Sequence, residues 1–159
     1  ASVQEVKEER YEAEQAQSQI GEIAQDEAAS GGKAVAHVPE DAKDEGFLIY
    51  GQYPYAPSGV YEARFRVKAL NAAASDRPIF RVEVTANFGE AQIAGRDVFR
   101  QDLPSDGTFT DIALPFVLSH DSKLMEFRVL TRGRAALSVD CVTVKSHEGV
   151  WFKQPLAVR

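Results

Sequence analysis

The sequence predicts an all-β domain, an antiparallel β-sandwich of the jelly-roll type. Apolar and polar residues alternate along most of the chain after Gly31, and turn-forming segments such as Pro104-Ser105-Asp106-Gly107 separate the alternating runs. The length of 159 residues suits one domain, and 44% hydrophobic residues are enough to build a core. We therefore expect a single domain over residues 1–159, with a core at about 9–145 and a C-terminal extension at 146–159.

The N-terminal segment allows two interpretations. From Val3 to Ala29 it is rich in Glu, Gln and Ala, lacks proline and contains one glycine, Gly21. Intrinsic propensity favours a helix for such a composition. A strand over residues 9–15 is the alternative, and the motifs described below favour it.

The chain from residue 33 onward contains eight runs that we interpret as strands. The alternation is clearest in Val60–Ala69, where Phe65 and Val67 face one side and Arg66 faces the other. The predicted strands are Lys33–Val38, Phe47–Tyr50, Val60–Ala69, Phe80–Asn87, Ile93–Phe99, Phe109–Leu118, Met125–Val129 and Leu137–Val144. In the last run the apolar phase changes near Asp140, which predicts a β-bulge.

The charge distribution limits the kinds of partner. The net charge is −6, so wrapping a nucleic acid is disfavoured on electrostatic grounds. Residues 1–45 hold twelve Asp or Glu against four Lys or Arg, which is either a solvated face or a source of oxygen ligands for a hard cation. No apolar run approaches the ~18–20 residues that span a membrane, so we expect no membrane insertion. The single cysteine, Cys141, excludes an internal disulfide.

The sequence contains no recognisable catalytic arrangement. His37, His120 and His147 are far apart in the sequence and do not have a zinc-binding spacing. A Gly-x-Ser-x-Gly nucleophile elbow and a glycine-rich phosphate loop are both absent from the sequence. We therefore expect that the domain is not an enzyme.

Two further groups of residues each allow a structural and a functional interpretation. Charged residues on the strands either form a binding plateau or, as we prefer, a solvent face with cross-strand ion pairs. They are Glu62, Arg64, Arg66, Arg81, Glu83, Glu126 and Arg128. The loop Tyr50-Gly51-Gln52-Tyr53-Pro54-Tyr55 either stacks sugar rings or caps one end of the sandwich, and both interpretations stay open.

Three separated motifs resemble a known family of β-sandwiches. They are Tyr11-Glu12-Ala13-Glu14, Ala29-Ser30-Gly31-Gly32-Lys33-Ala34-Val35 and Leu137-Ser138-Val139-Asp140-Cys141-Val142. Their order and spacing resemble the carbohydrate-binding modules of families six and thirty-five, within the galactose-binding-like superfamily. Those modules open with a Glu-Ala-Glu strand, pass an Ala-Ser-Gly-Gly turn and close with a hydrophobic-Asp-hydrophobic strand. The resemblance implies a jelly-roll fold and a strand at residues 9–15.

The resemblance also implies a structural calcium ion. Carried onto this sequence, the ligands would be Glu12, Glu14 and Asp140, with backbone carbonyls from the Gly31–Lys33 turn. Calcium takes about 6–8 oxygen ligands, and residues two positions apart in a strand point to the same side. The composition allows the alternative that both glutamates lie on an acidic helix surface.

Strand counting and the resemblance together predict where a sugar binds. If each strand crosses the sandwich once, the loops at 39–46, 70–78, 101–107 and 132–134 share one end, which is the sugar-binding end of the resembling modules. The residues expected to bind carbohydrate there are Asp41, Asp44, Asp76, Arg77, Phe109, Arg132 and Arg134. Carboxylates and guanidinium groups can hydrogen-bond sugar hydroxyls, and arginine can pair with a uronic acid. The opposite end, with the tyrosine loop, is the alternative.

The sequence thus predicts a non-catalytic polysaccharide-binding module with a structural calcium ion. We expect an extracellular or cell-envelope location, with other domains of a parent protein as further partners. The alternative is a structural or protein-interaction sandwich that has kept the scaffold and lost sugar binding.

Overall fold

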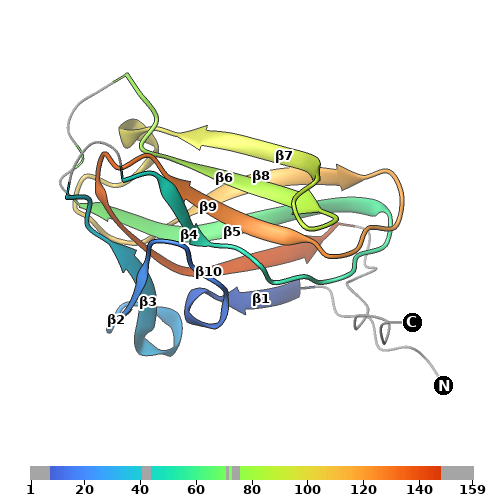
Figure 1. Cartoon of the computed structure of the whole chain (residues 1–159), viewed down its shortest axis with the longest axis horizontal. Helices are drawn as coiled ribbons and strands as arrows, with labels where there is room; N and C mark the ends of the chain where they lie inside the picture. The colour runs from blue at the N-terminus through green and yellow to red at the C-terminus, as the bar shows by residue number, and fades with distance from the viewer. Residues whose placement is uncertain (1–7, 41–43, 71, 73–75, 148–159) are drawn as a thin grey trace.

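Two antiparallel sheets face each other across the core (Figure 1). The computed structural model describes residues 8–40, 44–70, 72 and 76–147. The strands in these residues are β1 (Glu8–Glu12), β2 (Glu22–Gln25), β3 (Lys33–His37), β4 (Gly46–Ile49), β5 (Gly59–Leu70), β6 (Phe80–Ala86), β7 (Ala91–Val98), β8 (Thr110–Leu118), β9 (Glu126–Thr131) and β10 (Ala136–Ser146). The larger sheet has the order β2-β3-β10-β5-β8, with β1 also paired to β10, and the smaller sheet has the order β4-β9-β6-β7. The predicted all-β sandwich is confirmed.

All eight strands that the alternation predicts are present, with small shifts at their ends. β2 is an additional short strand that the sequence did not reveal. The described residues contain no helix of the length and apolarity that a membrane crossing requires. The predicted C-terminal extension, which includes Trp151, lies beyond the described residues from 148 onward, so the domain boundaries stay a prediction.

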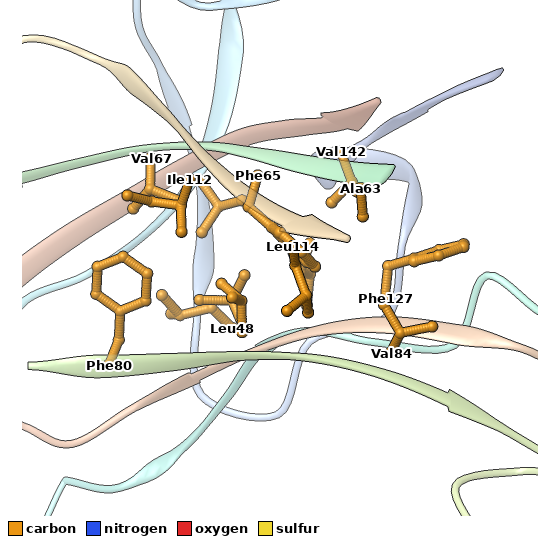
Figure 2. Packing of buried hydrophobic residues seen from close by; sticks show 14 of the residues in the cluster. Leu48, Ala63, Phe65, Val67, Phe80, Val84, Ile112, Leu114, Phe127 and Val142 are labelled. Atoms are coloured by element: carbon orange, nitrogen blue, oxygen red, sulfur yellow. The ribbon is translucent and has the colours of Figure 1, made fainter. Parts of the chain in front are cut away.

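The core lies between the sheets and is built from the apolar sides of the alternating strands. Phe65 and Val67 of β5 are fully buried and point toward the smaller sheet (Figure 2). From the opposite side, Leu48, Phe80 and Phe127 fill the space between the layers. Full burial of a side chain of this size stabilises the folded state by roughly 1.5–3 kcal/mol relative to exposure.

The N-terminal segment begins as a strand, so the helix that its composition favours is wrong there. β1 pairs antiparallel with β10 along its whole length. The ring of Tyr11 stacks on Phe127 of the opposite sheet, with 5.4 Å between the centroids. The strand ends at Glu12, and Ala13–Gln15 form a 3-10 turn. The motif had implied a strand over residues 9–15. That prediction is wrong for residues 13–15, because Glu14 lies in the turn.

The predicted bulge in the last strand is confirmed. The pairing of β10 with β5 shifts register between Val139 and Cys141, which leaves Asp140 as the extra residue. On its other edge, β10 pairs with β3 before the bulge and with β1 after it. Asp140 lies where these two N-terminal strands separate, and it is fully buried.

The outer face of the smaller sheet carries a chain of ion pairs. The guanidinium groups of Arg128 and Arg81 both reach the carboxylate of Glu83, at 2.9 and 3.2 Å. Arg81 also pairs with Asp97 of β7 at 3.3 Å. The Arg128–Glu83 and Arg81–Asp97 pairs join neighbouring strands, as expected for cross-strand ion pairs, whereas Arg81 and Glu83 lie on the same strand and Glu83 is buried.

Candidate functional site

The loops of the sandwich gather at two ends, and the register of the strands shows which loops share an end. Phe80, the first residue of β6, lies opposite Val98 at the end of β7 and Thr131 at the end of β9. We call the left-hand end in Figure 1 the Arg134 end, and it comprises residues 38–40, 44–45, 76–79, 99–109 and 132–135. The right-hand end is the Tyr53 end, with residues 50–58, 87–90 and 119–125. The loops alternate between the two ends as expected.

Two adjoining clefts lie at the Arg134 end. The larger has a volume of about 510 Å³ and extends along β2 and β3 to Asp44. The smaller, of about 300 Å³, lies between Val38–Glu40 and the turn that contains Arg134. Both clefts are lined by Val38 and Glu40, so the segment between them forms a shared wall.

The larger cleft is acidic and contains one unusual imidazole. Glu22, Glu40 and Asp44 line it together with His37. Nε2 of His37 lies 3.7 Å from the carboxylate of Asp44 and is a buried nitrogen without a hydrogen-bond partner in the described residues. The same carboxylate accepts a hydrogen bond from the backbone N–H of Glu40 at 2.7 Å. Asp44 therefore holds the backbone of the cleft wall at Glu40 and places a carboxylate near the imidazole without a hydrogen bond to it.

Each of the two predicted arginines of this end contacts a neighbouring segment. Arg134 donates a hydrogen bond to the backbone carbonyl of Pro78, and Arg132 lies 3.9 Å from Asp97. Gly133 between them has a left-handed backbone, and a Cβ there would lie 3.0 Å from the carbonyl oxygen of Asp44. The structure thus brings the Arg132–Arg134 turn against Asp44, although the two are far apart in the sequence.

The other predicted carbohydrate residues are placed less centrally. Asp76 and Arg77 are exposed in the loop that leads to Pro78. Asp41 lies outside the described residues. The half-buried ring of Phe109 lies under two cations from the outer face of β5, with Arg66 at 4.6 Å and Lys68 at 4.7 Å from its centroid. The ring of Phe109 was expected to stand at the edge of a sugar site, but these cation–π contacts cover the face on which a sugar would stack.

The motif glutamates lie next to the Ser30 turn and have unused carboxylate oxygens. Glu12 accepts a hydrogen bond from the hydroxyl of Ser30 at 2.9 Å through Oε1. Oε2 of Glu12 and Oε1 of Glu14 are buried and have no hydrogen-bond partner in the described residues. Buried carboxylate oxygens without a partner are costly, and a cation relieves this cost. These two side chains therefore fit a bound cation.

Asp140 is already engaged by protein groups. It accepts hydrogen bonds from the backbone N–H of Ser30 at 2.8 Å and from Arg66 at 2.7 Å, and Arg66 also donates to the carbonyl of Ala28 at 3.0 Å. Within the described part of the chain, no three His, Cys, Asp or Glu side chains converge into a metal-binding cluster.

Burial, together with the negative charges of Asp140 and Glu12, raises the pKa of the Cys141 thiol to about 12.

Three features of the structure could not be recognised from the sequence. The lining of the larger cleft by Glu22, Glu40 and His37 was not expected. The partnership of Arg66 with Asp140 was also missed, because the two residues are on strands that only the fold makes neighbours. The third is the contact of Tyr53 with Phe88, which is described below.

These features define a β-sandwich with loop clefts at one end and two buried, partly unpaired carboxylates, Glu12 and Glu14, beside the Ser30 turn. Among solved structures, the chain is similar to the C-terminal CBM6 module of LamC, a marine laminarinase from Zobellia galactanivorans. The two are 13% identical with a TM-score of 0.60, and the match covers 87% of this chain and 99% of the other.

Two further solved modules share the fold. One is the CBM6 module of Cellvibrio mixtus lichenase 5A in complex with cellotriose, at 16% identity and a TM-score of 0.59, covering 87% of this chain and 96% of that chain. The other is a family 35 module from Clostridium thermocellum, at 19% identity and a TM-score of 0.56, covering 87% and 98%. No family model and no curated protein sequence matches the chain. The resemblance to family six and thirty-five modules is therefore confirmed at the level of the fold.

Proposed function

We propose that this chain is a non-catalytic polysaccharide-binding module that holds sugar at the Arg134 end. The observation that carries the proposal is the pair of clefts that meet at Val38 and Glu40 and contain Asp44 and Arg134. The shared fold supports it, since the similar solved modules are carbohydrate-binding modules and one is in complex with cellotriose. A secreted or cell-envelope parent protein is the setting that suits such a module.

The chemistry of the two clefts suits a sugar. The carboxylates of Glu22, Glu40 and Asp44 can accept hydrogen bonds from hydroxyls, and Arg134 can donate them. The exposed side chain of Val38 offers an apolar surface to the C–H face of a pyranose. The arginine at one side also suits the carboxylate of a uronic acid.

One observation favours the alternative of a protein-interaction sandwich. None of the described residues that line the two clefts is a Phe, Tyr or Trp, and Phe109 is covered by Arg66 and Lys68. Aromatic rings supply the flat faces on which sugars commonly stack. A glycan array distinguishes the two functions, because the interaction sandwich would bind no polysaccharide.

The paired substitution Arg132→Ala with Arg134→Ala is expected to weaken polysaccharide binding at least tenfold, equivalent to about 1.4 kcal/mol. The reason is the loss of hydrogen-bond donors beside the smaller cleft. Affinity electrophoresis in gels that contain β-glucan, xylan, galactan or polygalacturonate measures the effect. No release of reducing ends is expected in the same samples, because the module is proposed to be non-catalytic.

The matched control is Arg64→Ala with Lys145→Ala, which removes two exposed cations from the outer face of the larger sheet. It separates a local effect from a change in net charge. Equal weakening by both pairs would contradict the location, and turnover of any polysaccharide by the pure chain would contradict the absence of catalysis.

We further propose that Glu12 and Glu14 bind a structural calcium ion. Their two buried, unpartnered oxygens support this, and a hard cation prefers such carboxylates. Backbone carbonyls of the 30–33 turn are the natural additional ligands. Asp140 contributes by fixing this turn through the N–H of Ser30, alongside its pairing with Arg66.

Removal of calcium with EDTA is expected to lower the melting temperature by about 5–10 °C. Saturation at ~100 times the Kd stabilises the folded state by ~2.7 kcal/mol, and each kcal/mol corresponds to about 2–4 °C for a domain of this size. The substitution Glu14→Gln should abolish the calcium-dependent part of the stability. Glu27→Gln, which changes an exposed carboxylate in the loop between β2 and the Ser30 turn, should leave it intact. Identical melting curves in EDTA and in calcium would exclude the site.

A further inference from the structure

The loops of the Tyr53 end contain several residues in an unfavourable left-handed backbone conformation. In the described part of the chain, the non-glycine residues with a left-handed backbone are Tyr53, Asn87, Phe88 and Leu124, with φ of 62°, 54°, 57° and 52°. All four belong to the three loops of this end. A left-handed backbone is unfavourable for side chains with a Cβ, most of all for a bulky one such as phenylalanine. Such strain persists only where the surrounding structure imposes it, and it is characteristic of functional sites.

Backbone hydrogen bonds between the three loops impose this conformation. The N–H groups of Asn87 and Phe88 donate to the carbonyls of Lys123 and Leu124, and that of Tyr53 donates to Met125. Within the β6–β7 turn, the N–H of Gly89 donates to Ala86, which with two left-handed central residues makes a type I′ turn. Asn-Gly is the preferred pair at the centre of such a turn, and here phenylalanine takes the glycine position.

The strained turn keeps the aromatic ring of Phe88 exposed to solvent. Phe88 is 62% exposed, and among the described residues of these three loops it is the large apolar side chain that solvent reaches most. Its ring makes an edge-to-face contact with Tyr53, with centroids 5.1 Å apart and planes at 68°. In this arrangement the edge of one ring meets a face of the other, so the two rings form a corner, and the high exposure of Phe88 leaves its ring accessible to a ligand.

The surroundings of this corner suit a sugar ring. Asn87, Glu90 and Lys123 are exposed next to it and offer polar groups to hydroxyls. Flat aromatic faces suit the apolar C–H faces of a pyranose. A stable protein partner would need roughly 1,200–2,000 Å² of buried surface, and a single exposed aromatic pair with a charged rim offers little of that.

We propose that Tyr53 and Phe88 form a second sugar-stacking site, separate from the clefts at the Arg134 end. The chain would then hold two polysaccharide strands, one at each end of the sandwich, and link them to each other. Sugar stacking at Tyr53 and Phe88 shares with the proposed function only the class of ligand and does not depend on binding at the Arg134 end. Only the linking of two strands rests on the proposed function as well.

Two pairs of substitutions separate the two sites. Wild type, Arg132→Ala/Arg134→Ala, Tyr53→Ala/Phe88→Ala and the fourfold variant are compared by affinity electrophoresis in soluble β-1,3-glucan, hydroxyethyl cellulose, xylan and polygalacturonate. Each pair is expected to lose part of the binding and the fourfold variant to lose all of it. In dynamic light scattering, wild type should enlarge the particles of the bound polysaccharide, and either pair should abolish this cross-linking.

The outcomes distinguish failure of this site from failure of the proposed function. Complete loss of binding in the arginine pair alone would overturn the Tyr53 site and leave the proposed function standing. Complete loss in the aromatic pair alone would support the Tyr53 site and overturn the Arg134 end. Binding that survives in the fourfold variant, or a wild type that binds none of the four polysaccharides, would overturn the inference.

Conservative variants test the stacking itself. Phe88→Tyr should keep the binding, while Phe88→Leu, which keeps an apolar side chain but removes the flat ring, should lose it. Val117→Ala is the control for an exposed apolar residue on another surface. Wild-type affinity in Phe88→Leu would contradict stacking. Concentration-dependent self-association of wild type that Phe88→Ala removes would identify a second copy of the chain as the occupant and overturn the proposal.

Discussion

Replacement of Phe127 by alanine is expected to lower the free energy of unfolding by about 3–5 kcal/mol. Phe127 is fully buried between the sheets (Figure 2). It stacks on Tyr11 at 5.4 Å and lies 6.3 Å from the ring of Phe116. Truncation leaves a cavity and also removes the contact that joins β1 to the opposite sheet. Urea unfolding followed by circular dichroism measures the loss.

The matched control for Phe127 is Phe88→Ala, which deletes an equally large but mostly exposed ring. Its effect on stability should be no more than about 1.5 kcal/mol, because it removes only the edge-to-face contact with Tyr53 and no core packing. A loss below about 1 kcal/mol in Phe127→Ala would contradict the central place of this ring in the core.

Replacement of Arg66 by alanine is the second change with a large expected effect, a loss of about 2–4 kcal/mol. Removing one partner of a fully buried ion pair costs roughly 3–5 kcal/mol because the other charge is left uncompensated. Here the carboxylate of Asp140 is fully buried while the side chain of Arg66 is 36% exposed, so water lessens the effect. Thermal and urea unfolding, each in EDTA and in calcium, measure it and separate it from any effect of a bound cation.

Arg64 provides the control on the same strand. Its guanidinium pairs with Glu62 at 2.6 Å, and the arginine side chain is largely exposed. Exposed ion pairs contribute little to stability, so Arg64→Ala should unfold at nearly the same urea concentration as wild type. Equal destabilisation by both substitutions would show that the burial of Asp140 is not the cause.

The Arg66→Ala and Arg64→Ala variants also test the proposed calcium site. Arg66 holds Asp140, Asp140 anchors the backbone of Ser30, and the hydroxyl of Ser30 donates to Glu12. The loss of Arg66 should therefore loosen the Ser30 turn next to the glutamates. The calcium-dependent part of the melting temperature is then expected to shrink in Arg66→Ala and to stay unchanged in Arg64→Ala.

The strands and the core were predictable because their signal is local. In β5, residues two apart along the chain share a face, and the apolar members Phe65 and Val67 became the core. The bulge at Asp140 was visible for the same reason, since an inserted residue reverses the apolar phase of the strand. The loops at the Arg134 end could be grouped together because antiparallel strands return the chain to the same end.

Intrinsic propensity failed where long-range pairing decided the structure. The composition of the N-terminal segment favours a helix, yet β1 gains a full ladder with β10 and buries Tyr11 against the opposite sheet. Neither partner is near in the sequence, so only the three motifs pointed to the strand.

The fold and its alternating faces were thus determined by the sequence, whereas the sites were decided by the tertiary structure. Asp44 meets the Gly133 turn, Asp140 meets Arg66, and Tyr53 meets Phe88. Each contact joins residues from different strands or loops, so it depends on sheet order, register and loop conformation together. Alternation along a strand determines which face of the sheet a side chain occupies. Residues from different strands or loops become neighbours only when the two sheets pack against each other. The burial of apolar surface between the sheets drives this packing.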